Sequence, residues 1–148
     1  MRQAFVIVLA IVFLAGCGGG GGGGEPLTKE EYASKADAIC AKYNAQVKAL
    51  DDPSNLSELA DIADKTLPIL DNAISDLKKL KPPADEQSLA TQWLVQVEGL
   101  KNDLQEIRDK ANAKDIQAVQ QVVPKAEQHN ARSNELATEL GMTVCNSD

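Results

Sequence analysis

Four segments of this 148-residue chain repeat apolar side chains at steps of three and four. The third segment shows the pattern most clearly, with Leu89, Trp93, Val97, Leu100, Leu104, Ile107 and Ala111 on one stripe. Such spacing places apolar side chains on one face of an α-helix, whereas a half-buried strand requires strict alternation. The pattern predicts helices over residues 29–50, 56–80, 84–111 and 115–140.

Residues that begin and end helices flank these segments. Thr28 and Glu31 have the spacing of a capping box, and Asn55 can cap the second helix. The Lys81-Pro82-Pro83 sequence should end the second helix, because a residue before proline avoids the helical region. Gly141 is placed to adopt the left-handed conformation that often follows a helix.

Two prolines lie inside predicted helices. Pro68 and Pro124 each lack an N–H group, and their rings clash with the preceding turn, which should kink or divide the helix. We therefore expect an all-α fold, an antiparallel up-down-up-down four-helix bundle with kinked second and fourth helices. The bends should let residues 28–148 close over a small, filled core, leaving any binding surface outside.

The start of the chain has the pattern of a signal peptide. Arg2 precedes an unbroken apolar run over residues 4–14, which is too short for a membrane-spanning helix of about 20 residues. Phe5 and Phe13 both lie in this run. The rest of the chain contains few aromatic residues, so its core must be built from aliphatic side chains that favour helices over strands.

The sequence Leu14-Ala15-Gly16-Cys17 directly follows the run and resembles the lipobox of bacterial lipoproteins. The resemblance implies cleavage after residue 16 and a lipid on the Cys17 sulfur, which would anchor the chain at the extracytoplasmic face of the cell membrane. Residues 17–27 would then form a tether, whose seven glycines span about 15 Å as flexible coil. The alternative is an ordinary signal peptide or an uncleaved anchor with a chance cysteine.

Cys40 and Cys145 are the two cysteines that remain once Cys17 carries lipid. An oxidising compartment favours a disulfide between them, which gives the bundle its one expected cross-link. Closing a loop of roughly 100 residues stabilises a fold by up to ~4.7 kcal/mol in the chain-entropy model. Two free thiols are the alternative.

The charge of the chain excludes some classes of partner. The formal charge of −7 becomes −8 when Arg2 is removed with the leader. Binding to nucleic acid uses clustered Lys and Arg, so we expect no nucleic-acid partner. The same charge disfavours attraction to anionic lipid heads, which leaves the lipid on Cys17 as the contact with the membrane.

Residues suited to catalysis, metal or cofactor binding are scarce. His129 is the only histidine, and Glu127 misses the Glu-x-x-His spacing of di-iron bundles. Met142 lies thirteen residues from His129, too far along one helix end to clamp a haem iron with it. The acidic residues of the second segment lack the spacing of a calcium loop and are expected to form a solvated face, namely Glu58, Asp61, Asp64 and Asp71. We expect no metal, no cofactor and no catalytic residue, and hence not an enzyme.

Asn130 and Ser133 occupy positions on the apolar stripe of the fourth helix. Buried polar groups need hydrogen-bond partners, so these side chains could fix the register of the bundle, as a buried Asn does in coiled coils. They could instead form a polar notch beside Pro124 that holds a small ligand. The register role is the interpretation that we prefer from the sequence.

Three stretches of residues 32–145 together resemble a group of small secreted or lipid-anchored actinobacterial proteins. They are Ala36-Asp37-Ala38-Ile39-Cys40, the run from Leu77 to Asp85 that contains Pro82-Pro83, and Leu140-Gly141 before Cys145. The resemblance implies a helical fold, the turn at the prolines and the disulfide. It assigns no functional residue.

The sequence thus favours a non-enzymatic, lipid-tethered interaction or binding module at the cell envelope, with a partner that it does not identify. The alternative is a carrier or sensor for a small ligand that binds in a cavity of the bundle. A concave pocket with converging polar groups would favour the carrier. A filled core with a flat apolar patch would favour the interaction module.

Overall fold

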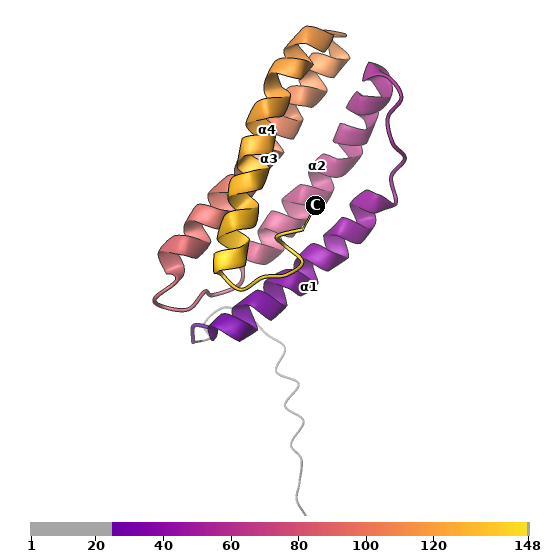
Figure 1. Cartoon of the computed structure of the whole chain (residues 1–148). Helices are drawn as coiled ribbons and strands as arrows, with labels where there is room; N and C mark the ends of the chain where they lie inside the picture. Colours follow the sequence, from indigo (N-terminus) through magenta and orange to yellow (C-terminus); the bar gives the residue numbers. More distant parts are fainter. Residues whose placement is uncertain (1–24, 148) are drawn as a thin grey trace, which may run out of the picture.

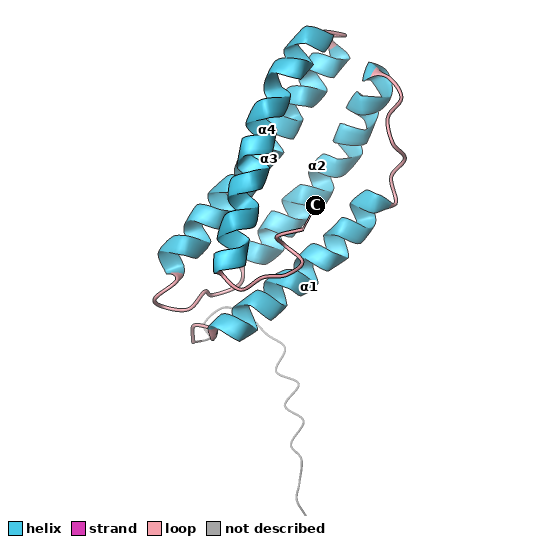
Figure 2. Ribbon diagram, in the orientation of Figure 1, coloured by secondary structure: helices cyan, strands magenta, loops and turns pink. Residues whose placement is uncertain are grey.

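A computed structural model describes residues 25–147 and contains four helices, α1 (Lys29–Lys48), α2 (Leu56–Lys78), α3 (Gln87–Asn112) and α4 (Ile116–Glu139). These described residues include no strand (Figure 2), which confirms the all-α expectation. The signal peptide expected over residues 1–16, Cys17 and the glycine run lie outside the described residues.

Consecutive helices are joined at alternate ends of the bundle, as Figure 1 shows. Each helix packs mainly against its neighbours in sequence, α1 on α2, α2 on α3 and α3 on α4. The segment after α4 turns back across the bundle towards α1 (Figure 1). This C-terminal segment, residues 140–147, joins the first and last helices.

The helix starts follow the expected capping signals, with one exception. Thr28 Oγ1 accepts a hydrogen bond from Glu31 N at 3.2 Å, and Glu31 Oε2 accepts one from Thr28 N at 3.0 Å, which confirms the capping box. Asn55 likewise caps α2. The helix predicted from residue 84 begins at Gln87 instead, because residues 84–86 form a turn in which Glu86 N donates to the carbonyl of Pro83 at 3.0 Å.

Neither internal proline divides its helix, because α2 and α4 continue on both sides of Pro68 and Pro124. Both prolines are exposed, and so are Asp64 and Gln120, the residues four positions earlier. The carbonyl groups that lose a helical donor can therefore bind water. The helices tolerate these prolines because the defects lie on the solvent side.

The expected glycine cap of α4 is confirmed. Gly141 has a φ of +82°, and its N–H donates to the Thr138 carbonyl at 3.0 Å, while Met142 N donates to the Ala137 carbonyl at 2.9 Å. These two bonds make a Schellman motif. The same pair of bonds ends α3, where the left-handed position is held by Lys114 with a φ of +60°.

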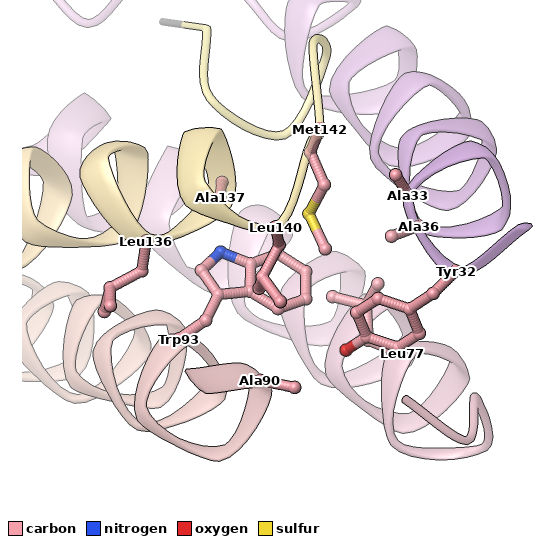
Figure 3. Close-up of a cluster of buried hydrophobic side chains, with 10 residues drawn as sticks. All are labelled: Tyr32, Ala33, Ala36, Leu77, Ala90, Trp93, Leu136, Ala137, Leu140 and Met142. Carbon is pink, nitrogen blue, oxygen red and sulfur yellow. The ribbon is translucent and has the colours of Figure 1, made fainter. Parts of the chain in front are cut away.

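The main core lies where α1 begins and α4 ends (Figure 3). Its largest members are Tyr32, Leu77, Trp93, Leu136, Leu140 and Met142. A second, smaller buried cluster consists of Ala60, Ala111 and Val119. The apolar contacts are thus divided into two groups, and the candidate site described below adjoins the larger one.

Candidate binding site

A partly enclosed cavity of about 170 Å³ lies beside the main core. Residues from all four helices and from the C-terminal segment line it. Its walls are mainly apolar, with Leu70 of α2 and Leu100 of α3 among them. A smaller set of polar side chains from α4 faces the same space, including Asn130 and Ser133.

Trp93 is the largest side chain among the residues that line this cavity. It lies on the apolar stripe of α3, and only 1% of its surface is exposed, as the heptad pattern predicts. Its indole Nε1 has no hydrogen-bond acceptor among the described residues. Figure 3 shows this nitrogen on the side of the ring that faces α4, away from Tyr32. An indole N–H is a donor only, so a buried one without an acceptor carries a desolvation cost.

The two polar residues singled out on the α4 stripe both line the cavity. Ser133 is buried, with 4% of its surface exposed, and Asn130 is half-buried. The sequence interpretation that we preferred for them was control of register. Their position fits the alternative, a polar notch, only in part, because both residues line the cavity but Pro124 does not.

The disulfide closes one side of the cavity. Cys40 of α1 and Cys145 of the C-terminal segment form the expected bond, with a Cα–Cα distance of 5.4 Å, and both residues line the cavity. The bond joins positions 105 residues apart and confirms the predicted pairing. It also fixes the C-terminal segment between α1 and α4.

A second contact holds the same segment in place. The Asp37 carboxylate accepts hydrogen bonds from the backbone N–H groups of Thr143, Val144 and Cys145 at 2.8 to 3.0 Å. The Thr143 hydroxyl adds a fourth at 2.9 Å. Burial alone would raise the pKa of Asp37, but these bonds outweigh burial and hold its pKa below the ordinary value of 3.8. Successive backbone donors around one carboxylate form an anion-binding nest. We call this contact the Asp37 clamp.

A buried charge cluster lies between α3 and α4. Asp103 is fully buried, with its Oδ2 2.5 Å from His129 Nδ1 and its Oδ1 2.8 Å from Lys125 Nζ. Burial alone would raise the pKa of Asp103, but the Lys125 and His129 partners lower it below its ordinary value. His129 thus has a buried carboxylate partner, while its own side chain stays partly exposed. Gly99 leaves room for it, since a Cβ on Gly99 would lie 2.9 Å from the imidazole ring.

This cluster was missed because its members lie far apart in the sequence. Asp103 precedes His129 by 26 positions. A signal was present, since Asp103 lies three residues after Leu100 and next to Leu104, at the edge of the apolar stripe. A charged residue there must find a partner on the facing helix.

The other residues that were considered as metal or haem ligands do not lie together. Met142 packs in the main core, with 1% of its surface exposed. Of the acidic residues on α2, Asp64 pairs with Arg108 at 3.3 Å and Asp71 with Lys101 at 2.7 Å. Between residues 25 and 147, no group of three or more His, Cys, Asp or Glu side chains is arranged to hold a metal ion.

None of the four described helices has both the length and the apolar character that crossing a bilayer requires. Comparisons with protein-family models, curated proteins and solved structures find no match to this chain.

Proposed function

We propose that this protein is a lipid-tethered, non-enzymatic binding module at the extracytoplasmic face of the cell membrane, and that it carries or senses a small ligand. The observation that supports this proposal best is the cavity beside Trp93. Its walls are mainly apolar and include Trp93, and a few polar side chains from α4 face the same space. Small-molecule sites in proteins have this composition, with few polar groups among apolar ones.

The tether is supported by the cysteine pairing. Cys40 and Cys145 are bonded to each other, which leaves Cys17 as the cysteine outside the disulfide. It follows the apolar run at the position that the lipobox resemblance assigns to lipid. Intact-mass analysis of protein extracted from membranes should show loss of residues 1–16 and added acyl mass. A Cys17→Ser chain that is cleaved yet stays in the membrane fraction would refute lipid anchoring.

The non-enzymatic character is supported by the Asp103 cluster. The Asp103 carboxylate binds the imidazole of His129 and the ammonium of Lys125 together. Both partners stabilise the negative charge of a carboxylate that is buried between two helices. This is a structural role. It gives no reason to assign His129 as the base of an activated nucleophile.

Recovery of a native ligand tests the carrier function. Protein purified from its own membranes under mild conditions should retain a small molecule that native mass spectrometry detects. An Ala73→Leu change, which fills the cavity wall on α2, should abolish the retention. Ala41→Leu, the same change at an exposed position of α1, is the matched control. Equal retention by both variants would contradict a ligand in this cavity.

Docking of a partner protein is the second candidate function. Ile116 and Val123 are both exposed, at 50% and 39%, and lie seven residues apart on one face of α4. Such a face can bind another protein. Cross-linking in native membranes should capture a partner that Ile116→Ser and Val123→Ser together release. If the partner were instead lost from the Ala73→Leu variant but kept by the double serine variant, the partner would bind at the cavity.

A further inference from the structure

The size of the cavity beside Trp93 limits what it can enclose. Its volume of about 170 Å³ is close to the roughly 150 Å³ of an engineered apolar cavity in another protein, which binds benzene. The cavity therefore has room for about one aromatic ring with a short substituent. A long acyl chain is too large to be enclosed there.

The side chains of the cavity wall limit the charge of an occupant. None of the described residues that line the cavity is charged at neutral pH. An ion inside the cavity would lose its hydration without gaining a counter-charge, which is strongly unfavourable. We therefore expect a neutral occupant.

Most polar side chains in the cavity wall already have partners. The hydroxyl of Tyr43 donates to Asp76 Oδ2 at 2.7 Å, and the hydroxyl of Ser147 donates to a backbone carbonyl at 2.7 Å. Asn130 and Asn134 also interact with other groups. A ligand that bonded to any of these side chains would have to compete with interactions that already exist.

The hydroxyl of Ser133 on α4 is buried in the same wall without a partner. It makes no hydrogen bond within residues 25–147, although only 4% of the residue's surface is exposed. The polar atoms that are both unpaired and fully enclosed belong to Glu86, Trp93 and Asp103. The Ser133 oxygen is not among them, so part of its surface stays accessible to a molecule in the cavity.

Asn44 of α1 is a second polar side chain of the wall that has no partner within the described part of the chain. It is half-buried, and it also lines a more open hollow of about 260 Å³ that shares three further residues with the cavity. Water can reach Asn44 from this hollow, whereas Ser133 depends on what the cavity contains. Selection of a ligand should therefore depend mainly on Ser133.

We propose that the cavity binds a neutral, ring-sized apolar molecule with one hydroxyl or carbonyl group, and that this group bonds to the Ser133 hydroxyl. A serine hydroxyl both donates and accepts, so it can pair with either group. A wholly apolar ligand would leave the hydroxyl buried without a partner, which costs free energy. This inference rests on the proposed function in one respect, that the cavity is the binding site. It adds the chemical class of the ligand and the residue that selects it.

Three probes of nearly equal size separate these requirements. Benzyl alcohol carries a hydroxyl, ethylbenzene carries a methyl group in its place, and benzylammonium carries a charge. The protein is the full chain with Cys17→Ser, recovered after export with its disulfide intact, so that no acyl chain competes for the cavity. Calorimetry measures the affinities. Trp93 is the only tryptophan in the sequence and lines the cavity, so its fluorescence reports whether the cavity is occupied.

Comparing the parent chain with Ser133→Ala isolates the hydrogen bond, because the hydration of each probe is the same for both chains. Ser133→Ala should weaken the binding of benzyl alcohol about fivefold, the factor for one neutral hydrogen bond, and should not weaken that of ethylbenzene. Ser34→Ala, the same change at an exposed position of α1, should bind both probes like the parent chain. Benzylammonium should not bind measurably. Equal losses for the two neutral probes, binding of benzylammonium, or no binding of any probe would each overturn the proposal.

The stability of the chain without ligand separates this role of Ser133 from control of register. A hydroxyl that makes no hydrogen bond in the free protein does not stabilise the fold, so Ser133→Ala should have a Tm no lower than that of Ser34→Ala. A clearly lower Tm would show that Ser133 serves the packing of the bundle, and would count against the proposal.

Failure of this inference and failure of the proposed function give different results. Ala73→Leu should abolish binding of both neutral probes, whereas Ala41→Leu should not. Probes that are lost in Ala73→Leu but bind equally well to Ser133→Ala would refute the inference and leave the cavity as a small-molecule site. Binding of benzyl alcohol that depends on Ser133, in a protein that retains no molecule from its own membranes, would support the inference and refute the carrier function alone.

Discussion

Replacing Asp37 by Asn tests whether its carboxylate holds the C-terminal segment. The side chain accepts four hydrogen bonds from Thr143, Val144 and Cys145. A hydrogen bond to a charged group contributes about 1.5–3 kcal/mol. The contributions do not add fully, because Asp37 is only half-buried and water can reach the freed donors. We expect Asp37→Asn to lower the free energy of unfolding by about 2–3 kcal/mol, which corresponds to roughly 10 °C in Tm.

The effect of Asp37→Asn should depend on pH in a defined direction. The pKa of Asp37 is lower in the folded protein than its ordinary value of 3.8. The clamp therefore stabilises the fold fully above that value and loses its effect as pH falls through the folded pKa. The difference in Tm between the parent chain and the variant should be largest at pH 7 and should shrink towards pH 2.

Thermal unfolding followed by circular dichroism, with the disulfide intact, measures both effects. Asp61→Asn is the matched control, since it makes the same chemical change at an exposed position of α2. Two results would refute the reasoning. One is equal stability of the Asp37→Asn and Asp61→Asn chains at pH 7, and the other is a Tm difference from the parent that persists unchanged at pH 2.

Three further changes test other parts of the fold. Lys114→Gly should raise the free energy of unfolding by about 1 kcal/mol, because Lys114 has a φ of +60° and glycine adopts that conformation without strain; a lower Tm would contradict this. Removal of the disulfide by Cys40→Ser with Cys145→Ser should cost about 2–4 kcal/mol in urea unfolding, and no change in midpoint would show that the bond does not stabilise the domain. Gly99→Ala should cost about 1–3 kcal/mol, because its Cβ would lie 2.9 Å from the ring of His129; an unshifted imidazole resonance together with parental stability would contradict that contact.

The features that the sequence predicted well are determined by neighbours in the chain. The capping box of Thr28 and Glu31 and the glycine cap at Gly141 depend on residues within one helical turn. Apolar periodicity likewise located the four helices to within a few residues at each end. The disulfide was predictable for a different reason, since two cysteines outside the lipobox leave one possible pairing.

The features of the site that sequence reasoning missed depend on long-range geometry. The Asp37 clamp joins residues more than one hundred positions apart, and Asp37 has the sequence context of an ordinary surface residue of a helix. The cavity, which the sequence offered only as an alternative, is lined by all four helices and the C-terminal segment, so its shape depends on how these elements pack together. Apolar periodicity predicts which face of a helix is buried. It does not predict where a cavity remains between two buried faces.

The disulfide has a mechanical consequence for a chain that is tethered at its N-terminal end. A pull on the proposed tether would first act on α1, which packs mainly against α2. Residues 25–39 lie before Cys40, and when fully extended they reach about 50 Å. Unwinding of these residues would remove Tyr32 from the main core and break the Asp37 clamp, and unwinding beyond Cys40 would also have to drag Cys145. The load would therefore pass to a covalent bond before it could separate the two parts of the cavity wall that Cys40 and Cys145 supply.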